Sequence, residues 1–442
     1  MNRAEQIRYP MILTNLLLGV ALSFFVLFPG TGGYERIQNG KFEMFSLLFG
    51  GYLILMALFT AEMALMRRIQ LPRPRQLWSG AAWEEKLIFI YWLLTLVSTL
   101  ISPYGQGTLL GLSRNEGFLT QTIYCGTFLC VSRFARPKAW MMHLFSATMT
   151  VFCAICLLQM RGGNPLGLYP AGTDFFGANR DYPGMYLGTT GNADLTAALL
   201  CLAIPLFAVW LLLGKQRSRF WAAIPLALCV ATVMEANVQA GLVGMVCGMA
   251  LVLPVALPVK QNFKKWLWLA LVIVAAVVLW YAYTNHRTWG LAYEAREILH
   301  GNFDSSFGSG RIGIWKEILH RVPGRIAFGY GPDTMAAQQI SLYSRVINGV
   351  EIPLVIDVAH NEYLNILYHH GIFALLSYLL ALGISFVRWI RSGWRDAAAA
   401  ACGGAVVCYG IQAFFGFSMC QTAALFWLAL AVLNRQTREV IS

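Results

Sequence analysis

Apolar runs of roughly 20 residues recur along almost the whole chain and are separated mainly by short polar loops. An α-helix needs about 20 apolar residues to cross a bilayer, so each run predicts a membrane span. The pattern therefore predicts an all-α polytopic membrane protein with about twelve transmembrane helices. The predicted spans are residues 11–29, 43–66, 86–102, 116–132, 138–160, 193–213, 219–236, 238–258, 266–283, 368–388, 397–417 and 419–434.

Two polar segments are much longer than the other loops. Residues 161–192 are rich in Gly, Pro, Asn and Asp, and residues 284–361 form the longest polar stretch of the chain. Loops of this length in a compact protein are usually functional. We therefore divide the chain into residues 1–283, with nine spans and the smaller loop, a large helical loop at 284–361, and residues 362–442 with the last three spans.

Short helices are expected within the large loop because apolar residues recur there at helical spacing. Each is short enough to lie over one end of the bundle rather than to cross the membrane. The expected helices are Leu291–His300, one from Arg311 with Ser309 as its N-cap, Met335–Val346, and one that begins near Asp357 and runs into the tenth span.

Composition supports the membrane class. Hydrophobic residues make up 57% of the chain and charged residues 12%, whereas a soluble domain carries about 25% charged residues. A β-barrel would show short alternating segments, which this sequence lacks. All ten cysteines lie in apolar runs, so the pair Cys153-x-x-Cys156 is interpreted as helix packing rather than as a zinc or redox motif.

Charge then orients the predicted spans. If the N-terminus is cytoplasmic, every cytoplasmic loop carries an excess of Lys and Arg, as the positive-inside rule requires. Both termini are then cytoplasmic, and the loop at 284–361 is extracytoplasmic. The net charge of +12 is in this view a signal of topology, and no nucleic-acid partner is expected.

Arg311 follows Gly308-Ser309-Gly310 at the start of a predicted helix. A helix N-terminus offers free N–H groups and a positive dipole end, and arginine adds a bidentate charged donor. This combination is typical of a phosphate or pyrophosphate site. A capped surface helix with a solvated arginine would give the same pattern, and the motif by itself leaves both interpretations open.

His360 lies where the large loop re-enters the membrane, between Asp357 and Glu362. A histidine near neutral pH can accept a proton from a sugar hydroxyl, and a neighbouring carboxylate can orient it. A histidine that is merely solvated at the membrane interface is the alternative. The seven histidines show no metal-ligand spacing, so neither a catalytic metal nor a cofactor is expected.

The sequence resembles the bacterial O-antigen ligase and O-antigen polymerase family of membrane glycosyltransferases. The matching motifs are Gly310-Arg311 with Trp315, Pro323 with Gly329-Tyr330-Gly331, and His360-Asn361-Glu362-Tyr363-Leu364, all in one large late loop. The turns Gly111–Gly117 and Gly191-Asn192 are also similar to those of the family.

The resemblance implies a type C glycosyltransferase fold related to the SEDS proteins, in the bacterial cytoplasmic membrane. It also implies a metal-independent inverting transfer from a glycan linked to undecaprenyl pyrophosphate. Arg311 would hold the donor pyrophosphate and His360 would deprotonate the acceptor hydroxyl. Further substrate-binding candidates on the same side are Arg114, Arg180, Gln239, Asp357, Asn361, Glu362, Trp315 and Tyr330.

One position departs from the family pattern. Many members carry an arginine as a second pyrophosphate ligand in a Ser-Arg-Gly-like turn, and this chain has Gln239 in Val238-Gln239-Ala240-Gly241. Glutamine donates hydrogen bonds but supplies no charge. Arg114 or Arg180 is the expected replacement, unless the donor site itself differs.

Three acceptors are compatible with the resemblance. A polymerase uses another lipid-linked repeat unit and can work with a chain-length regulator, a ligase uses lipid A–core, and an oligosaccharyltransferase uses protein Ser or Thr. We favour the polymerase. A transporter or lipid-glycan flippase is the rival class, but it would place polar residues at mid-membrane and show internal repeats, and neither feature is present.

Overall fold

The computed structural model describes residues 3–66, 73–168, 188–347 and 350–441, and it is about 75% helical. In the first part of the chain the helices are α1 (Arg3–Leu16), η1 (Leu17–Ala21), α2 (Leu22–Leu27), η2 (Tyr34–Arg36), α3 (Ile37–Phe45), η3 (Ser46–Gly50), α4 (Gly51–Leu65), α5 (Pro74–Gly80), α6 (Trp83–Leu100), α7 (Gly107–Leu110), α8 (Phe118–Phe134) and α9 (Ala139–Met160).

The second part begins with the helices of the bundle and continues into the large loop. Its elements are α10 (Ala193–Leu213), η4 (Arg217–Ala222), α11 (Ala223–Ala236), α12 (Gln239–Ala256), α13 (Gln261–Thr284), α14 (Leu291–Leu299), α15 (Arg311–Arg321), η5 (Val322–Arg325), η6 (Ala336–Gln338), β1 (Ser341–Ile347), β2 (Val350–Val355), α16 (Glu362–His370), α17 (Ile372–Ser392), η7 (Gly393–Arg395), α18 (Ala397–Gln412) and α19 (Cys420–Ile441).

Eight helical segments are long and apolar enough to cross a membrane, so the protein is an all-α polytopic membrane protein. They are Arg8–Leu27, Ile37–Leu65, Ala139–Met160, Ala193–Leu213, Arg217–Ala236, Gln239–Ala256, Gln261–Thr284 and Ile372–Arg395. Helices α6, α8, α18 and α19 occupy the other four predicted positions and pack within the same bundle. The count of twelve spans stays a prediction.

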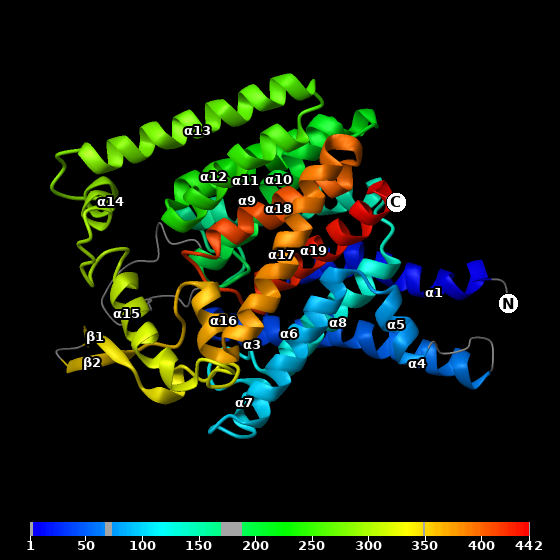
Figure 1. Ribbon diagram of the computed structural model, residues 1–442, viewed down its shortest axis with the longest axis horizontal. Coiled ribbons are helices and arrows are strands. Elements are labelled where there is room, and N and C mark those ends of the chain that lie inside the picture. The colour runs from blue at the N-terminus through cyan, green and yellow to red at the C-terminus, as the bar shows by residue number, and fades with distance from the viewer. Residues whose placement is uncertain (1–2, 67–72, 169–187, 348–349, 442) are drawn as a thin grey trace.

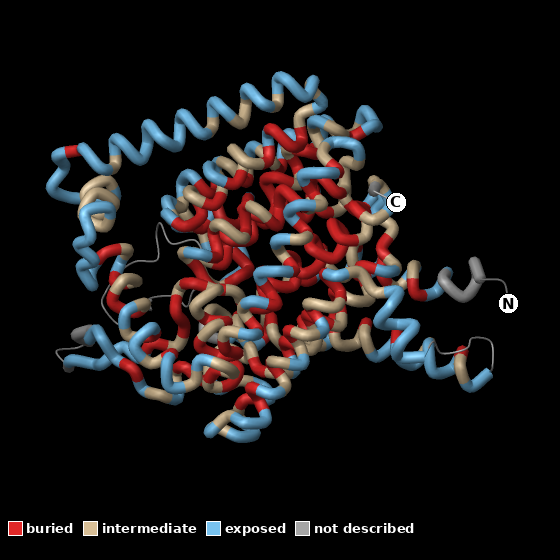
Figure 2. The backbone as a smooth tube through the Cα atoms, viewed as in Figure 1, coloured by how far each residue is buried: buried red, intermediate tan, exposed pale blue. Residues whose placement is uncertain are grey.

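The two ends of the bundle differ in what they carry. Figure 1 shows both termini at one end, and α14, α15 and the β1–β2 hairpin at the opposite end. Figure 2 shows the buried residues gathered in the middle of the bundle, whereas α13 is exposed along almost its whole length. An exposed helix of 24 residues that is apolar over most of its length is suited to lipid rather than to water.

Small residues set the packing of α10, α12 and α18. Gly241, Gly244 and Gly248 lie on one face of α12, and a Cβ added at Gly248 would come 2.7 Å from the Cα of Cys408 in α18. In lipid, the hydrophobic effect does not drive helices together, so helix association depends on close van der Waals packing. Small residues allow the two backbones to approach closely. Helix α18 therefore lies side by side with α12, and it also packs along α10.

Part of the large loop differs from the prediction. The helices at 291 and 311 are confirmed, but the predicted helix Met335–Val346 is wrong: a short 3₁₀ turn, η6, is followed by β1. Strand β1 pairs antiparallel with β2, with Ser341 opposite Val355 and Ile347 opposite Val350. The sequence between the strands is Asn348-Gly349, a strong hairpin signal, and β-branched residues alternate on both sides.

The helix expected from Asp357 into the tenth span is also wrong in its bounds. Helix α16 begins only at Glu362 and ends at His370, and α17 begins after Gly371. The φ of Gly371 is +85°, and the backbone of Ala327 lies so close that a side chain would not fit. The chain therefore breaks here because the loop passes against the bundle.

We expect Gly248→Ala to destabilise the protein, because the new methyl would overlap the backbone of α18. Overpacking of this kind costs about 1–3 kcal/mol, which should appear as a lower thermal unfolding temperature in detergent. The matched control is Gly383→Ala in α17, where an added Cβ meets no atom within 4 Å. Equal melting temperatures for the two variants would contradict the close α12–α18 packing.

Candidate active site

Three residues far apart in sequence meet at the end of the bundle that carries the large loop. Asp194 Oδ2 lies 3.6 Å from a guanidinium nitrogen of Arg311 and 3.9 Å from Nδ1 of His360. The carboxylate therefore lies between the two residues predicted to be catalytic. Arg311 and His360 are brought together as the sequence predicted, through an acidic residue that the sequence analysis did not select.

Asp194 is placed by the start of α10. The side chain of Asn192 caps this helix by accepting hydrogen bonds from the backbone N–H groups of Asp194 and Leu195, at 2.8 and 3.3 Å. An acidic residue in a first helical turn is ordinary because it complements the helix dipole. For that reason nothing in the sequence marks Asp194 as functional, and only the arrangement in space identifies it.

His360 is held from both sides by its neighbours. Trp315 Nε1 donates to the carbonyl of Ala359 at 2.9 Å, and Asn365 Oδ1 accepts from the Ala359 N–H at 2.8 Å. On the other side Asn361 caps α16. The φ of His360 is +48°, a conformation that costs energy for a residue with a side chain and is common at functional sites.

The imidazole of His360 packs edge-on against Phe417, and its Nδ1 is buried without a hydrogen-bond partner among the described residues. Burial lowers the pKa of His360 to about 4; Asp194 raises it, and Arg311 lowers it further. The ring is therefore neutral at pH 7. A neutral imidazole can accept a proton, and a nearby carboxylate stabilises the cation that forms.

Arg311 is the first residue of α15 and follows three residues with positive φ, at Gly308, Ser309 and Gly310. Gly310 is the N-cap, so the predicted cap by Ser309 is wrong. The first N–H groups of the helix are not free either. Those of Arg311, Ile312 and Gly313 are directed at the carbonyls of Gly308, Phe307 and Ser305.

The backbone amides at the start of α15 therefore do not form an open anion site. The reason is local: the preceding turn, closed by positive φ angles, folds its own carbonyls onto the helix start. The guanidinium of Arg311 makes no hydrogen bond with the residues that the structure describes. Its five donors stay available to a ligand, so any recognition of phosphate here depends on the side chain.

Arg114 has a different environment. Its Nε and Nη2 donate to the two carboxylate oxygens of Asp357 at 2.8 and 3.0 Å, and its guanidinium stacks 4.6 Å from the centre of the Phe417 ring. This bidentate pair ties the turn that contains Arg114 to the segment before His360. The Phe417 ring contacts both the guanidinium of Arg114 and the imidazole of His360, so it lies between these two side chains.

Asp333 holds the turn at residues 111–117 through hydrogen bonds to its backbone. Its carboxylate accepts from the backbone N–H groups of Ser113 and Arg114 at 3.1 and 2.7 Å. Burial raises the pKa of Asp333, and these hydrogen bonds offset only part of that rise. The turn at 111–117 and the segment around Asp333 thus form one support for the pair of Arg114 and Asp357.

The other candidate residues are engaged within the protein. Glu362 accepts from the Ser418 N–H at 3.0 Å, and burial raises its pKa to about 7. Asn361 is a buried helix cap. Tyr330 stacks on Tyr368, and its hydroxyl donates to the carbonyl of Arg321.

Two further residues predicted to contact the donor are Gln239 and Arg180. Gln239 is the exposed first residue of α12, and no hydrogen bond or ion pair of its side chain with the described residues is present. Arg180 lies outside the described residues. Within the described part of the chain, no group of three or more His, Cys, Asp or Glu residues could hold a metal ion.

Comparison with known families gives one match. Residues 224–379 match the family model described as O-antigen ligase, a stretch that runs from α11 into α17 and includes Arg311 and His360. Asp194 and Arg114 lie before this stretch. No curated protein matches the chain.

The low pKa of His360 predicts a pH-dependent stability. The unfolded residue, with a pKa of 6.5, binds a proton more readily than the folded residue. The contribution of neutral His360 is complete above about pH 6.5 and is lost as pH falls towards 4. The unfolding temperature of wild type should therefore fall relative to that of His360→Gln as pH falls from 7 to 4.5. A control variant, His320→Gln at the exposed end of α15, should stay parallel to wild type.

Proposed function

We propose that this chain is a membrane glycosyltransferase of the O-antigen ligase and polymerase type, and that it transfers a glycan from undecaprenyl pyrophosphate to an acceptor hydroxyl. The match of residues 224–379 to the O-antigen ligase family model supports this proposal. The transfer takes place at the extracytoplasmic face of the cytoplasmic membrane. The observation that carries the proposal is the meeting of Arg311, Asp194 and His360 at one end of the bundle.

In the proposed reaction His360 accepts the proton of the acceptor hydroxyl. The oxygen attacks the anomeric carbon of the donor from the face opposite the pyrophosphate, and the bond from that carbon to the pyrophosphate oxygen breaks. The configuration at the anomeric carbon is inverted and undecaprenyl pyrophosphate leaves. Asp194 stabilises the imidazolium that forms on His360, since its carboxylate is already 3.9 Å from Nδ1.

Arg311 stabilises the negative charge that develops on the departing pyrophosphate. Its guanidinium is permanently charged, is only 17% exposed, and makes no hydrogen bond with the described residues. A donor in such a shielded place acts more strongly on charge than it would in bulk water. Two arginine–phosphate contacts of this kind can neutralise a leaving group without a metal ion.

Arg114 is the proposed second positive charge. Its ion pair with Asp357 is only partly exposed, at 21% and 33% of the two side chains, and both residues line a small polar cavity with Glu362 and His369. A pyrophosphate near Phe417 would compete with Asp357 for this guanidinium. In this way Arg114 compensates for the uncharged Gln239.

We favour a polymerase that extends a lipid-linked repeat unit, with lipid A–core ligation as the alternative. The family match does not separate the two because both share the domain. A transporter is disfavoured because the polar cluster lies at one end of the bundle rather than at its middle.

The test is to incubate purified protein with a synthetic undecaprenyl-pyrophosphate repeat unit and to follow chain growth. We expect His360→Ala to lower the rate about 10²–10⁴-fold, as for loss of a general base. Arg311→Ala should lower it about 10²–10³-fold, as for loss of a charge-stabilising donor. The exposed variant His320→Ala should keep the wild-type rate. Full activity of His360→Ala would refute the proposed base.

The same assay separates the acceptors. A polymerase extends the repeat unit without any addition, whereas a ligase forms product only when lipid A–core is supplied. Activity that survives a chelator would agree with the metal-independent mechanism, and activity that is lost and then restored by a divalent cation would contradict it.

Asp194→Asn has its own expected outcome. The amide keeps the shape but cannot stabilise an imidazolium, so kcat should fall about tenfold or more while KM for the donor changes little. The matched control is Asp304→Asn, an acid-to-amide change at an exposed position of the large loop. A wild-type kcat for Asp194→Asn would remove this residue from the mechanism.

A further inference from the structure

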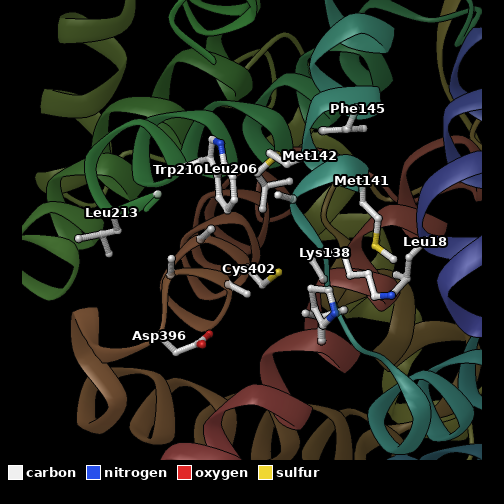
Figure 3. A pocket seen from close by; sticks show the side chains of 18 of the residues that line it. Leu18, Lys138, Met141, Met142, Phe145, Leu206, Trp210, Leu213, Asp396 and Cys402 are labelled. Carbon is white, nitrogen blue, oxygen red and sulfur yellow. The ribbon is translucent and has the colours of Figure 1, made fainter. Parts of the chain in front are cut away.

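A second cavity lies at the end of the bundle away from Arg311 and His360. Its volume is about 380 Å³, within the range of roughly 300–1,000 Å³ of small-molecule sites. Figure 3 shows Leu206 and Trp210 of α10 above the opening, with Asp396 and Lys138 on either side below. The walls come from α9, α10, α18 and α19, and from the helix formed by η1 and α2.

Four apolar residues of α10 line this cavity. Leu202, Leu206, Trp210 and Leu213 line it at helical spacing, which places them on one face of that helix. From the first to the last of these residues the helix rises by about 16 Å, at roughly 1.5 Å per residue. One leaflet of a bilayer has a hydrocarbon depth of about 15 Å, half of the roughly 30 Å core. The lining residues of α10 therefore span about the depth of one lipid leaflet.

The mouth of the cavity is positively charged. Lys138, Lys215 and Arg395 line it and are exposed, and their side chains make no ion pair or hydrogen bond with the described residues. The one acid there, Asp396, caps α18 by accepting from the Ala399 N–H at 2.7 Å. Three uncompensated cations thus surround the entrance of an apolar cavity.

We propose that this cavity binds one anionic phospholipid of the cytoplasmic leaflet. An acyl chain lies along Trp210 and Leu206, and the phosphodiester head group is held by Lys138, Lys215 and Arg395. Basic pockets between helices on the cytoplasmic side suit such head groups, and the cytoplasmic leaflet is the one rich in anionic lipid. The three cations lie in loops that the positive-inside rule places in the cytoplasm.

This site does not depend on the proposed transfer reaction. Asp194 stands at the start of α10 and Leu202 is about 12 Å further along the helix, at roughly 1.5 Å per residue. Lipid binding can therefore be measured without any glycan substrate, and inactive variants remain usable.

The experiment is native mass spectrometry of the purified protein after exchange into detergent, titrated with phosphatidylglycerol or phosphatidylcholine of identical acyl chains. Wild type should retain one phosphatidylglycerol and bind it more tightly than phosphatidylcholine. The triple variant Lys138→Gln, Lys215→Gln, Arg395→Gln should lower this retention about fivefold or more. Equal binding of the two lipids by wild type would overturn the proposal.

The charge-matched control is Lys260→Gln, Lys265→Gln, Arg391→Gln. These residues are exposed on the same predicted side but do not line the cavity. This control should bind phosphatidylglycerol as wild type does. An equal loss in both triple variants would show a general surface attraction and would refute a defined site.

A second arm tests the apolar part. Ala398→Phe narrows the cavity and should lower phosphatidylglycerol retention, whereas Ala275→Phe on exposed α13 should not. If cavity variants fold poorly, wild type and Trp210→Phe can be compared with chain-brominated phosphatidylglycerol as the quencher. Quenching should fall when Trp210 is removed, and unchanged quenching would contradict an acyl chain in this cavity.

Discussion

The carboxylate of Asp194 joins the membrane bundle to the large polar loop at the point where chemistry is proposed. It lies within 4 Å of both Arg311 and His360, which belong to different parts of that loop. Helix α10, which carries Asp194, is the most buried of the eight candidate spans. A site built on such a helix is held in place by packing on every side, whereas a site made only of loop residues would move with the loop.

The loop itself is held down by contacts that leave the three residues free to act. Arg114 pairs with Asp357, and Asp333 anchors the turn of Arg114. Trp315 belongs to a small apolar core of the loop and fixes the carbonyl next to His360. Several of the motif residues thus have supporting roles, and the proposed chemistry depends on fewer side chains than the motif contains.

How much could be predicted from sequence depends on the range of the physics involved. Membrane spans follow from local apolar length and from loop charge, so helices occur at each predicted position. Arg311 and His360 were selected from the helix-start and membrane-entry patterns together with the family resemblance, since each pattern by itself left a structural alternative open. Asp194 was missed because an acid in a first turn is common, and its contacts are more than 100 residues away.

The errors within the large loop have equally physical causes. The predicted helix Met335–Val346 overlaps strand β1, although Asn348-Gly349 and the β-branched residues near it favour strands. The closed start of α15 could not be foreseen, because it depends on the left-handed conformations of Gly308, Ser309 and Gly310 together. Sequence spacing predicts where a helix begins but not where the carbonyls of the preceding turn point.

The two ends of the bundle use charge in opposite ways, and this difference bears on the class of protein. At the end with the termini, Glu85 is almost fully buried. Arg438 neutralises its carboxylate at 3.0 Å, and the Ser132 hydroxyl donates a hydrogen bond to it at 3.0 Å. Such a pair closes the bundle, because separating its partners would leave a charge buried alone. At the other end Arg311 and His360 keep unused hydrogen-bonding capacity within the described structure. A neutralised buried carboxylate at one end and unused hydrogen-bonding groups at the other suit the proposed catalysis at a single membrane face, whereas transport would require both ends to open.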